Sequence, residues 1–147
     1  MTSFLGKYRG KVVNNIDPLM LGRLIVLVPA VSELPLSWAM PCVPYAGRNV
    51  GFFALPPIAA NVWMEFEEGD PNYPIWTGCF WGDGEVPAKQ GLPTTKVIKT
   101  ETVTFEINDL LTSVSLEVLT PAGPVKFAQG SDGITLTIGS TSRKISV

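Results

Sequence analysis

Glu101-Thr-Val-Thr-Phe-Glu-Ile107 and Ser113-Val-Ser-Leu-Glu-Val118 alternate apolar residues with Thr, Ser or Glu. Such alternation is typical of a β-strand with one buried face and one solvated face. The same period predicts strands at Pro124–Phe127, Gly133–Ile138 and Arg143–Val147, and Asn, Asp, Pro and Gly occupy the turns between them. This part of the chain therefore predicts a ladder of short strands with one apolar face.

The apolar face of this ladder has no partner in the sequence, because no segment has the pattern of an amphipathic helix that could cover it. A small isolated sheet is only marginally stable in water. We therefore expect the face to pack against copies of itself in an intertwined oligomer. The residues predicted to form the shared core are Val103, Phe105, Ile107, Val114, Leu116, Val118, Val125, Phe127, Ile134, Leu136 and Ile138.

The composition favours an assembly subunit. Of the 147 residues, 46% are hydrophobic, which is enough for a real core, but only 16% are charged, against the usual quarter or so. The net charge of −2 argues against a nucleic-acid partner and against binding to an anionic membrane surface, since both require basic residues.

The absence of histidine excludes several chemistries. Ser-His-Asp and Cys-His catalysis and zinc sites built on histidine are not available to this chain. The only cysteines, Cys42 and Cys79, cannot complete a four-ligand zinc site. We expect them to be buried, reduced thiols, with a disulfide as the alternative. The chain is thus predicted to have no cofactor and no enzymatic activity.

The sequence predicts neither a signal peptide nor a membrane span. The N-terminal residues lack an apolar core segment, and the longest apolar run, Leu24–Val31, contains Pro29. We expect the protein to fold and assemble in a bacterial cytoplasm.

Residues 1–82 predict an all-β barrel. Alternating segments and turn residues recur through this region, and closing a short sheet removes its exposed edges. An OB-type barrel is the first choice, and a small sandwich or an SH3-like barrel is the alternative. Residues 83–96 have little periodicity and are predicted to be a linker, followed by the ladder over 97–147.

Several phrases of the predicted barrel together carry a family resemblance. They are the segments Tyr8–Leu24, Trp38–Tyr45, Gly51–Pro57 and Val62–Trp81. In this order and spacing the chain resembles the OB-fold domain of the central spike proteins of contractile injection systems. These include phage baseplate assembly protein V, the VgrG proteins of type VI secretion and the spikes of extracellular systems.

The resemblance implies a homotrimer in which the ladder forms a trimeric β-helix (β-prism) needle. The spike would connect a baseplate hub or tube protein to a tip protein, and would touch the target membrane only during puncture. The linker has no room for a lysozyme domain, and without histidine the iron-bound tip of some phage spikes is not available. The resemblance therefore implies a separate PAAR-type tip protein, docked on Ile145 and Val147.

Other residues allow competing interpretations. Arg48, Phe52 and Phe53 are predicted to dock the hub, or else to pack as an ordinary loop. The carboxylates of Glu65–Asp70 are expected at a solvated rim rather than in a cation site. The aromatic residues of the barrel leave open a second function, an OB-type module that binds carbohydrate or single-stranded nucleic acid.

Overall fold

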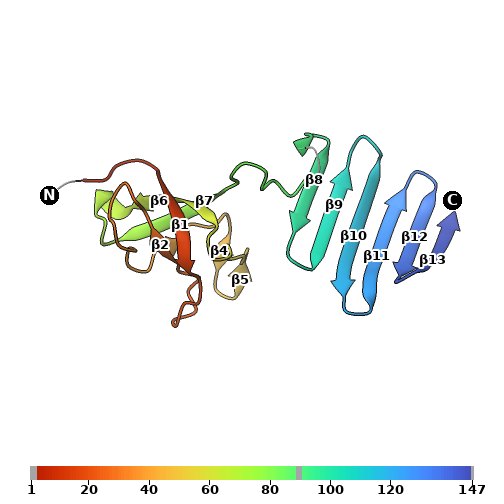
Figure 1. Cartoon of the computed structure of the whole chain (residues 1–147), viewed down its shortest axis with the longest axis horizontal. Coiled ribbons are helices and arrows are strands. Elements are labelled where there is room, and N and C mark those ends of the chain that lie inside the picture. Colours follow the sequence, from red (N-terminus) through yellow and green to blue (C-terminus); the bar gives the residue numbers. More distant parts are fainter. Residues whose placement is uncertain (1–2, 89–90, 147) are drawn as a thin grey trace. The chain divides into compact units, whose positions relative to one another are not determined.

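The computed structural model describes residues 3–88 and 91–146, and nearly all of its regular structure is β-strand. The chain divides into two compact units, Met1–Gly84 and Glu85–Val147, which are described separately (Figure 1). The predicted all-β class is confirmed.

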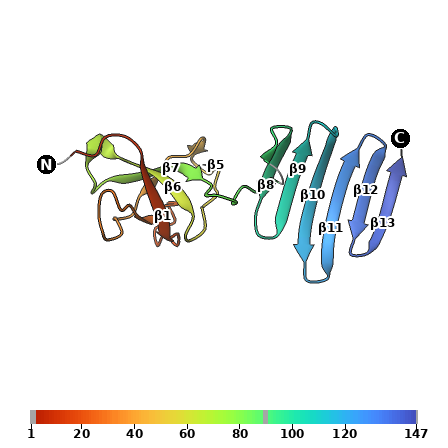
Figure 2. The same cartoon turned by 45° about the horizontal axis from the view of Figure 1, so that its top comes forward.

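The first unit is built on a curled five-stranded sheet with the strand order β2-β1-β6-β7-β3 (Figures 1 and 2). All neighbouring strands are antiparallel except β3 and β7, which are parallel. An antiparallel bridge between Leu24 and Ala39, just before β2 and β3, joins the two edges of the curled sheet. This arrangement agrees with the predicted OB domain. The strands are β1 (Tyr8–Asn14), β2 (Ile25–Leu27), β3 (Met40–Pro41), β6 (Asn61–Phe66) and β7 (Pro74–Phe80).

Two small elements complete this unit. The excursion between β3 and β6 contains a hairpin formed by β4 (Ala46–Gly47) and β5 (Val50–Gly51), which pair only with each other. A 3-10 turn, η1 (Glu67–Gly69), connects β6 to β7. The hairpin therefore stands apart from the barrel sheet.

The core of the barrel follows directly from strand alternation. In β6, Val62 and Met64 are fully buried, while Trp63 between them turns outward against Phe80. Gly10 on β1 is required by close packing, because a Cβ atom there would collide with the side chain of Val26. The buried apolar residues are Val12, Leu24, Val26, Val28, Ala39, Val62, Met64, Phe66 and Trp76.

The second unit is a six-stranded antiparallel meander in sequence order, β8 to β13 (Figure 1). The sequence predicted five of these strands, but β8 begins at Thr95, within the expected linker. The alternating segment is short and follows a loop with Pro93, so the sequence pattern did not indicate a strand. Hydrogen bonding to β9 holds these residues in a strand in the folded chain. The strands are β8 (Thr95–Lys99), β9 (Val103–Asn108), β10 (Ser113–Thr120), β11 (Gly123–Gly130), β12 (Gly133–Ile138) and β13 (Thr141–Ser146).

The pairing register gathers the predicted core residues on one face of this sheet. Leu116 lies opposite Phe105 on one side and Phe127 on the other, and Phe127 lies opposite Leu136. Residues directly opposite in antiparallel strands share a face. Within the single chain this face is open, with Ile138 still 60% exposed.

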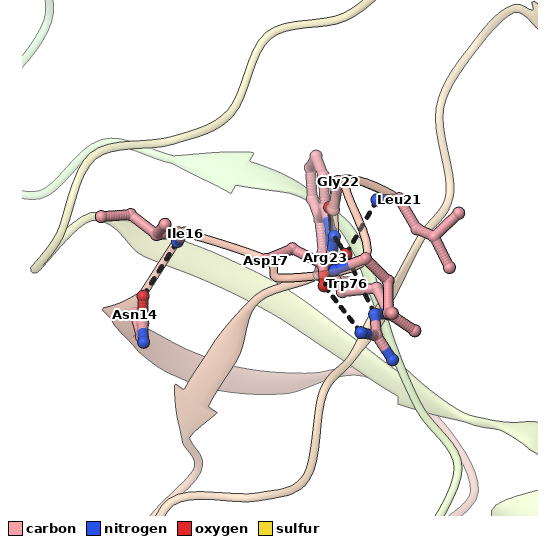
Figure 3. Close-up of polar contacts among 8 residues, drawn as sticks. Asn14, Ile16, Asp17, Leu21, Gly22, Arg23 and Trp76 are labelled. Atoms are coloured by element: carbon pink, nitrogen blue, oxygen red, sulfur yellow. Dashed lines mark hydrogen bonds and ion pairs between the residues drawn. The ribbon is translucent and has the colours of Figure 1, made fainter.

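The loop between β1 and β2, residues 15–24, is organised by the carboxylate of Asp17 and is called the Asp17 loop below. Asp17 accepts backbone N–H bonds from Leu19 (3.0 Å), Leu21 (2.9 Å) and Arg23 (3.3 Å). The Arg23 guanidinium also donates two bonds to it, at 3.0 and 2.6 Å (Figure 3). The indole N–H of Trp76 donates to the Gly22 carbonyl at 3.1 Å, which ties the loop to the core.

The Arg23 guanidinium, together with the backbone donors, holds the pKa of Asp17 well below its usual range, although desolvation acts in the opposite direction. A lowered folded-state pKa means that the ionised form stabilises the native state. This contribution is fully present above the pKa of an unfolded Asp, about 3.9, and is lost as the pH falls below it.

We predict that Asp17→Asn lowers the thermal midpoint of the barrel at pH 7 by several degrees, because the loop amides and the Arg23 guanidinium lose their anionic acceptor. The substitution should also flatten the fall in stability of the wild type below about pH 4. Arg23→Lys keeps the charge but not the two-pronged geometry, so it should cost less than Asp17→Asn. Circular dichroism melts at several pH values test this; equal acid sensitivity of wild type and Asp17→Asn would contradict it.

Candidate functional site

The carboxylates of the barrel serve local structure. Glu65 pairs with Lys7 at 2.7 Å, and Asp70 accepts the backbone N–H of Asn72 at 2.9 Å. Within residues 3–88 and 91–146, no group of three or more His, Cys, Asp or Glu side chains is arranged to hold a metal ion. Two exposed apolar surfaces stand out as candidate sites.

The first surface is the outward side of the Asp17 loop. Because Asp17 gathers the backbone donors inward, the apolar side chains of the loop project into solvent. Ile16 is 77% exposed and Met20 is 88% exposed, and Leu19 and Leu21 are exposed beside them. Met20 has a positive φ of 54°, so the loop holds this side chain outward in an uncommon backbone conformation. A fixed loop that presents aliphatic side chains is well suited to docking a partner, since little order has to be gained on binding.

A hollow of about 530 Å³ lies beside this loop. Met20 and Leu21 of the loop line it together with Phe52 and Phe53, which follow β5. Leu55 and Trp76 are also among the lining residues. The hollow is thus bounded by two segments that are far apart in sequence, and its lining is mainly apolar.

Two of the three predicted hub-docking residues line this hollow, and the third does not. Phe52 and Phe53 line it and are exposed, and the Phe52 N–H donates to the Tyr45 carbonyl at 2.9 Å. Arg48 lies in the turn between β4 and β5 and is not a lining residue.

Sequence reasoning missed Met20 and Leu21 as part of this surface. The signal was the apolar run Leu19-Met-Leu21 directly after the Asp17-Pro18 turn. The alternation instead predicts a strand over Leu21–Val28, with Leu21 in the core. In the structure β2 begins only at Ile25, because the Asp17 network holds the preceding residues in a loop.

The second surface is the apolar face of the C-terminal sheet. The register arranges its side chains in rows that run across the strands. One row contains Val103, Val118, Val125 and Ile138, and the middle row contains the larger side chains. The middle row is Ile98, Phe105, Leu116, Phe127 and Leu136.

The predicted tip-docking residues lie on the last strand. Ile145 is opposite Ile134 and so belongs to the apolar face, with 74% of its surface exposed. Val147 lies outside the described residues. Strand β13 is an edge strand, and every residue in it is exposed.

The cysteine prediction was wrong in one respect. Cys42 and Cys79 are both free and both exposed, not buried. Cys42 directly follows β3 and Cys79 is the penultimate residue of β7, so both lie at strand ends, where the barrel core no longer covers them.

The aromatic side chains of the barrel form separate groups, one of which consists of Phe4, Tyr8 and Phe66. The indole of Trp76 is buried in the core, and Trp38 lies under the Arg23 guanidinium at 5.4 Å. On the outer face of the sheet, Trp63 and Phe80 have ring centroids 4.6 Å apart. The Arg9 guanidinium lies over both of these rings, at 5.6 and 5.5 Å from their centroids.

In the described part of the chain, no helix has the length and apolar character needed to span a membrane. No curated protein matches this chain. The family model for the type VI secretion system/phage-baseplate injector OB domain matches residues 8–81, about half of the sequence and nearly all of the barrel. This match, together with the barrel fold of the same residues, shows that the chain belongs to the type VI secretion system/phage-baseplate injector OB-domain family.

Proposed function

We propose that the protein is the homotrimeric central spike of a contractile tail or injection system. The barrel belongs to a structural domain family of baseplates and type VI secretion systems. The observation that carries the proposal further is the C-terminal sheet, which has a largely apolar face that no other described element of its own unit covers. Three copies that turn these faces inward would form a prism-shaped needle with a dry core.

Hydrophobic burial supplies the driving force for this assembly. At about 25 cal/mol per Å² of apolar surface removed from water, covering the face in three chains contributes on the order of tens of kcal/mol before entropy costs. The opposite face of the sheet suits solvent, since Glu117 and Lys126 lie opposite each other there and pair at 3.8 Å. The two faces therefore have the character expected of the inside and the outside of a needle.

The barrel surface would then join the spike to the rest of the particle. The Asp17 loop and the hollow lined by Phe52 and Phe53 form an apolar docking surface for a baseplate hub or tube protein. At the other end of the chain, β13 would receive a separate tip protein of the PAAR type. In this proposal the spike pierces the target envelope mechanically, needs no cofactor, and is assembled in the bacterial cytoplasm.

We predict that the purified chain is a trimer at micromolar concentration and resists SDS without boiling. Phe127→Asp should abolish the trimer, because it would place three unpaired carboxylates in a dry core, between Leu116 and Leu136, at a cost of several kcal/mol each. The matched control is Thr135→Asp, whose side chain lies on the opposite face, across from Lys144. Light scattering measures the mass; a monomeric wild type would refute the spike, and equal effects at the two positions would refute the assigned inner face.

We predict that a fragment of residues 1–84 folds without the C-terminal sheet. Its core residues all lie within this fragment and its sheet is joined at both edges by the Leu24–Ala39 bridge. The fragment should be monomeric and show a cooperative thermal transition by circular dichroism. A fragment without a transition would contradict an independent barrel.

We predict that Phe53→Ser weakens binding to the hub protein of the same particle at least about tenfold, because a large aromatic anchor at the docking surface is lost. Leu34→Ser is the control: Leu34 is 73% exposed on the barrel, close to the 76% of Phe53, but does not line the hollow. Affinities measured by calorimetry with the purified hub should separate the two variants, and equal affinities would exclude the hollow as the hub site.

A further inference from the structure

A charged side chain interrupts the middle row of the apolar face of the C-terminal sheet. Another, Lys96, lies in an outer row opposite Ile107 and is paired with Asp109. The middle row of that face runs from Ile98 on β8 through Leu116 to Leu136 on β12, and the next position in register is Arg143 on β13. The row is thus apolar over five strands and cationic on the last one. Strand alternation puts Arg143 on the same face as the core residues.

Arg143 differs from its neighbour Lys144 in its surroundings. Lys144 points to the opposite face and pairs with Asp132, which lies in the turn before β12. Arg143 forms no ion pair with any residue that the structure describes. The guanidinium is therefore available for an external anion.

In a three-sided prism, the middle of each side lies nearest to the axis. If three copies turn their apolar faces inward, the middle rows converge and the three Arg143 side chains meet around the axis at the β13 end. Three guanidinium groups this close repel one another unless an anion lies between them. They also remain at the edge of the sheet, where solvent or a partner can reach them.

We propose that the three Arg143 side chains form an anion site at the end of the needle, and that this site binds carboxylate groups of the protein seated there. The proposal rests on the trimeric spike proposed above, and each copy contributes one third of the site. Guanidinium groups match carboxylates with two parallel hydrogen bonds, which favours a protein carboxylate as the occupant.

The residues around Arg143 define the rest of the partner surface. Ile145 shares its face and is exposed, while Thr141 lies on its other side along the strand. Beyond them, β13 has an unpaired edge whose backbone groups can accept a further strand. The matching surface is thus an acidic centre inside a less polar rim. A purely apolar tip would leave three buried cations unpaired, which is strongly unfavourable.

The test is to titrate benzene-1,3,5-tricarboxylate, which carries three carboxylates in threefold symmetry, into the full-length protein by calorimetry. We expect one molecule bound per three chains, with affinity that falls as salt is raised. Arg143→Gln should weaken binding at least about tenfold. Lys144→Gln removes a charge one residue away on the opposite face and should leave the affinity within about twofold of wild type. Inorganic phosphate, a smaller anion, should bind at least about tenfold more weakly than the tricarboxylate.

The outcomes separate this inference from the function on which it rests. Light scattering on the same samples gives the oligomeric state, and a wild type that is not a trimer overturns the spike and the site together. A trimer that binds no tricarboxylate, or binds one per chain, overturns the site alone. Equal losses in the two variants would mean a diffuse charge effect. Phosphate bound as tightly as the tricarboxylate would mean a site for small free anions. Equal losses in the two variants, or equal affinities for the two anions, would each overturn the assignment of a carboxylate-binding site.

Discussion

A β-sheet with one apolar face has to cover that face, and the two units of this chain meet the requirement in different ways. In the barrel the sheet curls on itself until the bridge between Leu24 and Ala39 joins its edges, and the enclosed residues are fully buried. In the C-terminal unit the six strands form an open meander whose apolar face stays exposed in a single chain. The first unit thus encloses its own core, whereas the apolar face of the second unit is left open.

The barrel shows how a buried charge can shape an apolar surface. Asp17 draws three backbone N–H groups and the Arg23 guanidinium inward, and this satisfies the polar groups of a loop that would otherwise be flexible. The apolar side chains of the same loop are left outside, next to Phe53 across the hollow. One ion pair thus accounts both for the order of the loop and for the exposure of its hydrophobic residues.

These features agree with the structural baseplate family to which the barrel belongs. The family of the barrel is a structural one, and both candidate sites are surfaces rather than clusters of reactive groups. The two faces of the C-terminal sheet are also unequal in character, since Glu117 and Lys126 pair on one side while Leu116 and Phe127 lie on the other. That inequality supports the proposed assembly, in which the apolar faces turn inward and the polar faces remain in solvent.

The sequence alone determined the strand pattern, because the period of two is a local property of the backbone. It predicted that Phe105 and Leu116 share a face, and the motifs between Tyr8 and Trp81 identified the family before any fold was seen. It overlooked β8, whose few residues carry too weak an alternation without the pairing to β9. The prediction that Cys79 is buried was also wrong, because the burial of a residue at a strand end depends on which other segments cover it.

Only the tertiary structure decided which distant residues meet. The hollow exists because the Asp17 loop and the segment after β5 lie side by side, and no local pattern links Met20 to Phe53. The place of Arg143 in the middle row likewise depends on the register of every strand before it, and a shift of one residue would turn it to the other face. Alternation specifies the two faces of each strand, but the pairing of strands decides which residues share a surface.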